Sequence, residues 1–259
     1  MELNTFLLMA GLMAFVAAVY SNIGLGGGVL YVPIMLWLTS FGKEEVVLLS
    51  LVLVVFTSLP STWNHLEKGK VDLKRGGILE SGSFIGAVFG VIFNLMISSS
   101  IFVLIFSLVL LLSGGKMLYN TLKGNNAETD RPGLLTPRNI AIATVLSAST
   151  GFISASMGIG GGAINVIILT EILGFSTKKA AGTSSFKTVF TATTGISIYL
   201  LSGVHLNLKV AILLAPLVFL SSYAGSRYGL RRLKSKEIRL IFIGGLFLAA
   251  AKMLLELVA

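Results

Sequence analysis

The chain has 259 residues, of which 54% are hydrophobic and only 12% are charged, and its mean hydropathy is +0.90. This composition excludes a soluble globular protein, so we expect an integral membrane protein in contact with the lipid bilayer. The net charge of +9 would favour a nucleic-acid partner in a soluble protein, but here the basic residues lie between apolar segments and report topology, so we expect no nucleic acid. Cysteine is absent, which excludes thiolate chemistry, and we expect no cofactor and no metal.

Apolar segments cover most of the chain, and they are continuous rather than alternating, which predicts helices. Five come first, at about residues 4–22, 29–40, 46–64, 76–95 and 101–119. A polar linker at 123–138, rich in glycine and proline turns, separates them from five more, at about 139–157, 163–173, 180–201, 208–225 and 238–258. We therefore predict a first membrane repeat at 1–122 and a second at 139–259.

A glycine-rich motif occurs once in each half. "SNIGLGGGVLYVP" from Ser21 to Pro33 returns as "ASMGIGGGAINVI" from Ala155 to Ile167, and a shift of 134 residues, later 135, aligns the two halves. Such repeats are common in transporters. The predicted fold is an all-α integral membrane protein with two inverted-topology repeats. Each repeat is a glycine-tipped helical hairpin, either re-entrant or fully crossing, followed by three transmembrane helices.

The distribution of charge predicts the orientation. If each glycine cluster is the tip of a hairpin, nearly all lysine and arginine residues outside the spans share one face, and Lys43, Lys209 and Lys252 lie on the other. The positive-inside rule then places the linker 123–138 in the cytoplasm and both termini outside, in the cytoplasmic (inner) membrane. Glu44 and Glu45 outside align with Lys178 and Lys179 inside, as expected for inverted repeats.

The glycine clusters are candidate anion sites. Glycine lets the backbone turn where a β-carbon would clash, and the next helix then begins with exposed amide N–H groups, which favour a negative ligand. The alternative is that the glycines only allow close helix packing. The predicted substrate-binding residues of these clusters are Ser21, Asn22, Gly26, Gly27, Gly28, Gly160, Gly161, Gly162 and Asn165.

The segment "AGTSSFKTVFTATTG" contains a lysine at an unusual depth. Lys187 follows Lys179 by eight residues, so it lies roughly 12 Å into its span, where a charge costs about 2.5–3.5 kcal/mol. Lys187 either balances the charge of a substrate anion or exchanges a proton with it. Alternatively it pairs with Glu171 or Glu80, or reaches the interface. The hydroxyls of Thr183, Ser184 and Thr191 are further candidate substrate contacts.

Two other titratable residues are candidates for proton coupling. His65 ends a polar strip in the first repeat, although its position near the end of a span also suits an ordinary hydrated imidazole. Glu80 lies about one turn inside the membrane from Arg75, and the alternative is an interfacial ion pair between these two side chains.

"GLGGGVLYVP", "GIGGGAINVI", "HLEKGKVDLKRG" and "AGTSS" together resemble the TauE/SafE sulfite exporter family over essentially the whole chain. The resemblance implies a protein that moves sulfite, sulfonates such as sulfoacetate, or related sulfur anions across the cytoplasmic membrane. One departure is Ile167, where the first motif has Pro33 and the family often has proline in both.

The residues and the resemblance together predict a secondary transporter, rather an exporter than an importer, that works by alternating access. An anion channel or a permease for another small anion is the alternative. We favour a membrane-embedded enzyme least, because the two histidines and the embedded acids are scattered along the chain.

Overall fold

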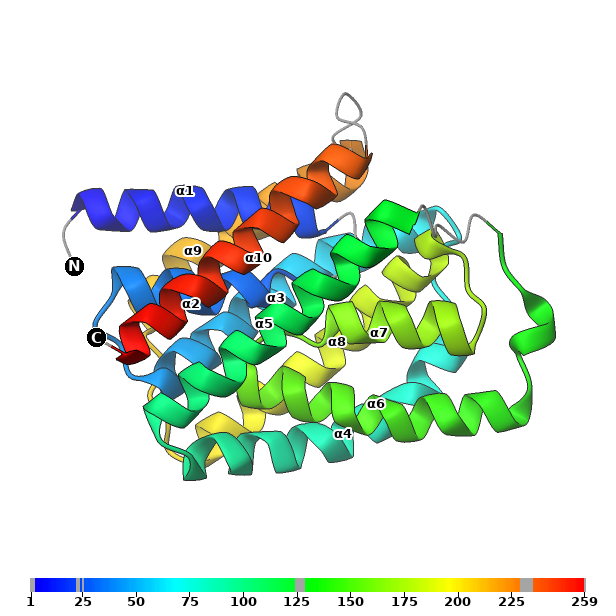
Figure 1. The fold of residues 1–259 in the computed structure, drawn as a ribbon, viewed down its shortest axis with the longest axis horizontal. Helices are drawn as coiled ribbons and strands as arrows, with labels where there is room; N and C mark the ends of the chain where they lie inside the picture. Colours follow the sequence, from blue (N-terminus) through cyan, green and yellow to red (C-terminus); the bar gives the residue numbers. More distant parts are fainter. Residues whose placement is uncertain (1–2, 22–23, 25, 124–128, 229–234, 259) are drawn as a thin grey trace.

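The computed structural model describes residues 3–21, 24, 26–123, 129–228 and 235–258. This part of the chain is helical (Figure 1). The first half contains α1 (Leu3–Tyr20), α2 (Gly28–Leu38), α3 (Lys43–Glu67), α4 (Leu73–Met96) and α5 (Ser99–Lys123). After the short 3₁₀ helix η1 (Pro132–Leu134), the second half contains α6 (Pro137–Met157), α7 (Gly162–Ile167), the π-helix η2 (Ile168–Ile172), α8 (Thr177–Leu201), α9 (Leu208–Tyr228) and α10 (Ser235–Val258).

Six helices in the described ranges are long and apolar enough to cross a membrane: α1, α3, α4, α5, α6 and α9. The prediction of an all-α, multi-pass membrane protein is therefore confirmed. Helix α8 has 25 residues, which is also long enough, but hydroxyl side chains and Lys187 make it more polar. Helix α2 has 11 residues and covers about 16 Å, roughly half of the hydrocarbon core.

Helices of the two halves pack against each other in equivalent ways. Helix α4 packs along α6 and α9 along α1, while α3 contacts α8 and α5 contacts α10 (Figure 1). Gly90 of α4 lies on the backbone carbonyl of Phe152, and Gly225 of α9 lies on that of Ala18. The predicted shift relates these two contacts, because it pairs Gly90 with Gly225 and Ala18 with Phe152. The membrane orientation of the two halves remains a prediction.

The two glycine clusters have the same backbone conformation. Gly24, Gly26 and Gly27 have φ angles of 75°, 76° and 80°, and their equivalents Gly158, Gly160 and Gly161 have 69°, 83° and 68°. These left-handed values are accessible to glycine without strain. The two turns are thus alike despite the missing second proline. The halves differ further along, where α2 contains Pro33 and α7 instead continues into η2.

Candidate functional site

The two glycine turns lie directly against each other between α3 and α8. Gly26 and Gly160 both face Val54 and Thr188, and a β-carbon on Gly160 would lie only 2.6 Å from Val54 Cγ1. Gly28, the first residue of α2, lies against the backbone of Gly158 and Ile159. The close-packing role of the glycines is therefore visible, and it also places the first residue of α2 against the turn that precedes α7.

Hydroxyl groups from α3 and α8 hold these turns in place. The Ser184 hydroxyl lies 2.9 Å from the carbonyl oxygen of Gly24 and 3.1 Å from that of Gly162. Its equivalent in the first half, Ser50, donates to the carbonyl of Gly158 at 2.7 Å. Each half thus secures the glycine turn of the other half, and Ser184 contributes to the position of the turns.

Lys187 lies at the centre of a buried polar cluster. Its side chain is 0% exposed, and Nζ donates to Ser147 Oγ at 2.9 Å and to Asn165 Oδ1 at 2.7 Å. Among the described residues no carboxylate oxygen lies within 4.0 Å of Nζ. The alternative of an ion pair with Glu171 is wrong, because Glu171 is exposed on η2. The wholly buried Lys187 side chain does not reach the interface either. The ammonium is held by neutral oxygens alone at hydrogen-bond distance.

Glu80 belongs to the same cluster. The Thr191 hydroxyl lies 2.6 Å from Glu80 Oε1, and Glu80 Oε2 is buried without a hydrogen-bond partner. The alternative of an Arg75–Glu80 ion pair is wrong, since Arg75 pairs with Asp72 at 2.7 Å, next to the start of α4. We name Glu80, Ser147, Asn165, Lys187 and Thr191 the Lys187 cluster.

Buried donors without partners lie in and beside this cluster. Asn165 Nδ2 and Ser154 Oγ are both buried without a hydrogen-bond partner. Ser154 lies beside Gly161, the residue that precedes α7, because a β-carbon on Gly161 would lie 3.2 Å from Ser154 Cβ. Buried polar groups are normally satisfied. An ammonium with neutral partners alone at hydrogen-bond distance, beside unused donors and the start of a helix, can bind an anion.

The remaining predicted residues lie outside the Lys187 cluster. Ser21 donates to the carbonyl of Ala18 at 3.1 Å, and Asn22 falls outside the described residues. Thr183 accepts a hydrogen bond from the Asp72 N–H at 3.0 Å. His65 is half-buried beside Gly182, with Nε2 lacking a partner. Their roles as substrate contacts or proton carriers stay predictions.

Ser147 and Ser154 are missing from the residues predicted from the sequence. A signal for them is present in α6, because Ser147, Thr150 and Ser154 recur at helical spacing and are all buried. In a helix that is apolar elsewhere, such a stripe of hydroxyls indicates a face turned toward other polar groups.

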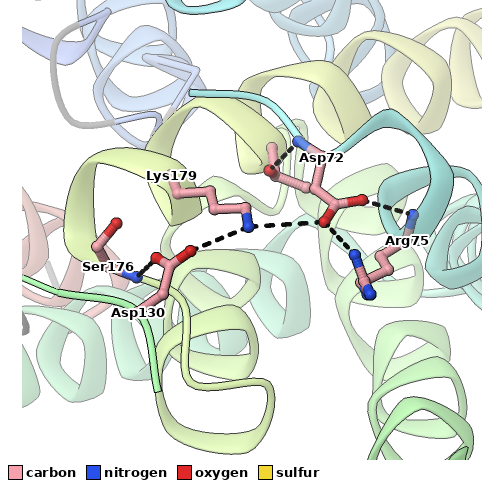
Figure 2. Close-up of polar contacts among 6 residues, drawn as sticks. Asp72, Arg75, Asp130, Ser176 and Lys179 are labelled. Atoms are coloured by element: carbon pink, nitrogen blue, oxygen red, sulfur yellow. Dashed lines mark hydrogen bonds and ion pairs between the residues drawn. The ribbon is translucent and has the colours of Figure 1, made fainter. Parts of the chain in front are cut away.

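An ionic network covers the start of α8. Figure 2 shows Lys179 between two carboxylates, with Nζ 3.0 Å from Asp130 and 3.7 Å from Asp72. The Ser176 N–H donates to Asp130 Oδ1 at 2.8 Å. Partial burial raises the pKa of Asp130, but the hydrogen bond from Ser176 and the Lys179 ammonium outweigh it, so this pKa lies below its ordinary value. The network joins the linker to α8 and to the α3–α4 connection.

Metal ligands do not gather in the structure. Within the described ranges, no group of three or more histidine, aspartate or glutamate side chains is placed to hold a metal ion.

Membrane-spanning helices around a buried ammonium and unused hydrogen-bond donors are typical of membrane transporters. The chain belongs to the sulfite exporter TauE/SafE family, because the sequence model described as "Sulfite exporter TauE/SafE" matches residues 8–253. The resemblance found in the motifs is thus confirmed, and the protein is a membrane transporter and not an enzyme.

Curated relatives agree with this assignment. The chain is 27% identical to "Probable membrane transporter protein YunE" of Bacillus subtilis (strain 168), over 97% of this chain and 98% of the relative. It is 26% identical to "Probable membrane transporter protein ORF9" of Sinorhizobium sp, over 89% of this chain and 85% of the relative. No solved structure matches the chain significantly.

Proposed function

We propose that this protein is a secondary transporter that exports a small sulfur-containing anion, such as sulfite or a sulfonate, by alternating access. The anion binds at Lys187, with Asn165 and Ser154 as donors and with the first amides of α2 and α7 nearby. Rocking of one repeat against the other exposes this site to either side in turn. The family description supports a sulfur anion as substrate.

One observation carries this proposal: the wholly buried Lys187 ammonium has neutral partners alone at hydrogen-bond distance. A charge at such depth in a membrane protein is costly unless a ligand or a partner compensates it. The residue equivalent to Lys187 in the first repeat is Leu53, which is also 0% exposed. The fold therefore accommodates an apolar side chain at this position, which supports a role for Lys187 in binding.

The proposed topology places both termini outside, the linker 123–138 in the cytoplasm, and the protein in the cytoplasmic (inner) membrane. Charge supports this arrangement, since the basic residues gather on the linker side. An inside-negative potential of about 100 mV drives each exported negative charge outward by about 2.3 kcal/mol. The potential therefore favours the export of any anion that crosses the membrane with a net negative charge.

The test is sulfite counterflow in proteoliposomes, with sulfoacetate, thiosulfate and sulfate as competitors. The variant Lys187→Leu carries the side chain of the first repeat, and Lys209→Leu makes the same change at an exposed site at the start of α9. A hydrogen bond to a charged group contributes about 1.5–3 kcal/mol, so we expect Lys187→Leu to weaken anion affinity about 10- to 100-fold.

Saturable counterflow that is lost in Lys187→Leu and kept in Lys209→Leu supports the proposal. Flux that rises linearly with anion concentration, without counterflow, would identify an anion channel instead. Saturable flux with unchanged affinity in Lys187→Leu would show that the anion binds elsewhere.

A further inference from the structure

The Thr191 hydroxyl has two oxygen neighbours and a single hydrogen. It lies 2.6 Å from Glu80 Oε1 and 3.1 Å from the carbonyl oxygen of Lys187. If Glu80 is ionised, Thr191 can donate to one of these oxygens and leaves the other without a hydrogen. If Glu80 is protonated, its O–H donates to Thr191, and Thr191 donates to the Lys187 carbonyl. Both hydrogen bonds therefore form together when Glu80 carries a proton.

The first repeat contains the same arrangement with a group that keeps its proton. Thr57, the equivalent of Thr191, donates to the carbonyl of Leu53 at 2.9 Å and lies 2.8 Å from the Tyr31 hydroxyl. Because the hydrogen of Thr57 is used on Leu53, the Tyr31 phenol is the donor in the second bond. The hydrogen-bond partner of Thr191 in the second repeat is instead Glu80 of α4, a helix of the first repeat. A carboxyl group, unlike a phenol, can release its proton at physiological pH.

Lys187 is the charged residue that lies near Glu80 on the helices that pack against α4. Helix α4 packs against α6 and α8. The one charged residue of α6 is Arg138, at its start, and α8 carries Lys178 and Lys179 in its first turn. On α4 itself, Lys74 and Arg75 lie in the first turn. Glu171 of η2 is exposed, so Lys187 is the charged group in the buried part of these helices that Glu80 faces.

Charge balance connects a proton on Glu80 to an anion on Lys187. Without the anion, a charged Lys187 and an ionised Glu80 sum to zero. If an anion binds while Glu80 is ionised, two negative groups share one ammonium in a medium of low dielectric, which is unfavourable. If Glu80 takes up a proton as a monovalent anion binds, the sum remains zero. The buried Oε2 atom, which has no partner, also favours the neutral acid.

We propose that Glu80 is the proton carrier of this transporter, so that one proton crosses the membrane with each anion bound at Lys187. This inference rests on the proposed anion site. The carboxylate takes a proton from water on the side where the anion binds and releases it to water on the side where the anion leaves. A divalent anion still moves one net negative charge, whereas a monovalent anion moves none and follows the anion and pH gradients.

The test uses proteoliposomes that contain a pH-sensitive dye, with thiosulfate as the anion, because thiosulfate is fully ionised near neutral pH and carries no proton itself. We expect thiosulfate entry into wild-type vesicles to acidify the lumen. In Glu80→Gln, any thiosulfate entry that remains is accompanied by no more acidification than in protein-free vesicles. Glu45→Gln, which removes an acid at the start of α3, keeps both fluxes.

The outcomes separate the inference from the proposed function. If neither sulfite nor thiosulfate shows saturable flux in the wild-type protein, the proposed function fails together with the inference. If anion flux is saturable in the wild-type protein but brings no proton, the inference alone is overturned. The wild-type result decides this even if Glu80→Gln does not fold.

Binding to the detergent-solubilised protein gives a second readout that needs no transport. By linkage, thiosulfate affinity weakens about tenfold per pH unit once the pH is high enough to ionise Glu80 in the empty protein. Infrared spectra are expected to gain a protonated-carboxyl band when thiosulfate binds, and this band is absent in Glu80→Gln. Affinity that is independent of pH, with no such band, would contradict the assignment of Glu80 as the carrier.

Discussion

The two predicted repeats place different side chains at positions that the shift of 134 residues makes equivalent. In the second repeat these positions contain Lys187 with its partners Asn165 and Ser147, all in contact through hydrogen bonds. The equivalent positions in the first repeat are Leu53, Tyr31 and Met13, and all three are 0% exposed. In the first repeat, an apolar residue fills the position of Lys187 and is completely buried. The difference supports the proposed role of Lys187 in substrate binding.

The acid Glu80, like Lys187, has an apolar residue at the equivalent position of the other half. Glu80 packs toward the second repeat, and its equivalent under the shift of 135 residues is Ala215, which is buried in the apolar core. The threonines Thr191 and Thr57 are identical in the two halves. The Lys187 cluster therefore combines a threonine that both halves contain with a lysine and a glutamate whose equivalent positions are apolar.

The largest effect is expected from giving the first repeat the charge of the second. Leu53→Lys places an ammonium in the apolar cluster that contains Met13 and Val218, and no aspartate or glutamate is fully buried in the described part of the chain. An uncompensated buried charge costs about 3–5 kcal/mol. We expect a large loss of thermal stability in detergent and a small yield of monodisperse protein.

Leu53→Met is the matched control, because it changes shape and keeps an apolar side chain. If Leu53→Lys unfolds at the wild-type temperature, the first repeat tolerates a buried charge as well as the second. The contrast between the two sites would then not identify Lys187 as functional.

Most helices and turns of the fold are predictable from the sequence, but less of the candidate site is. Helix α3 is found because Lys43–Glu67 is a long apolar run with charged ends, and the turns are found because Gly26 and Gly160 interrupt such runs. The hydrogen bond between Glu80 and Thr191 is not predictable, since the two residues are 111 positions apart and nothing local sets the facing of α4 and α8. In a bilayer, apolar residues face lipid and protein alike, so hydrophobicity does not identify the buried side of a helix.

A second prediction tests whether the two halves depend equally on the same glycine packing contact. Gly90→Ala and Gly225→Ala each add a methyl group against a backbone carbonyl, at Phe152 and Ala18 respectively. Overpacking of this kind costs about 1–3 kcal/mol, and we expect similar losses for the two variants in thermal unfolding. Gly77→Ala on α4 is the control. A β-carbon there meets no atom within 4 Å, so that variant gains up to about 1 kcal/mol from helix propensity.

Equal losses in Gly90→Ala and Gly225→Ala would confirm that both halves depend on the same contact. If one variant unfolds early and the other behaves like wild type, the contacts are not energetically equivalent. The comparison of Lys187 with Leu53 would then lose its basis, because the two environments would differ in more than chemistry.

The smallest effect on stability is expected at the edge of the membrane, where a charged side chain contacts water and loses little hydration energy. The equivalent helix starts differ here: the Lys43 ammonium in the first repeat is buried and donates to the carbonyl of Asn94 at 2.5 Å, whereas the Asp130 side chain beside α8 is 39% exposed. Exposed ion pairs contribute up to about 1 kcal/mol. Asp130→Asn should therefore lower stability by less than this at neutral pH.

The pH dependence of this loss has a definite sign. The pKa of Asp130 is lower in the folded protein than its ordinary value of about 3.9, so ionised Asp130 stabilises the fold above that value. The stabilisation is lost as the pH falls through the folded-state pKa. Thermal unfolding of the wild type and Asp130→Asn should therefore differ slightly at neutral pH and converge in acid. A large loss of thermal stability at neutral pH, or a loss that persists in acid, would mean that Asp130 stabilises the fold by more than an exposed ion pair does. A small, titrating loss instead agrees with the contrast between the repeats, in which a charge is costly at the buried centre and inexpensive at the exposed edge.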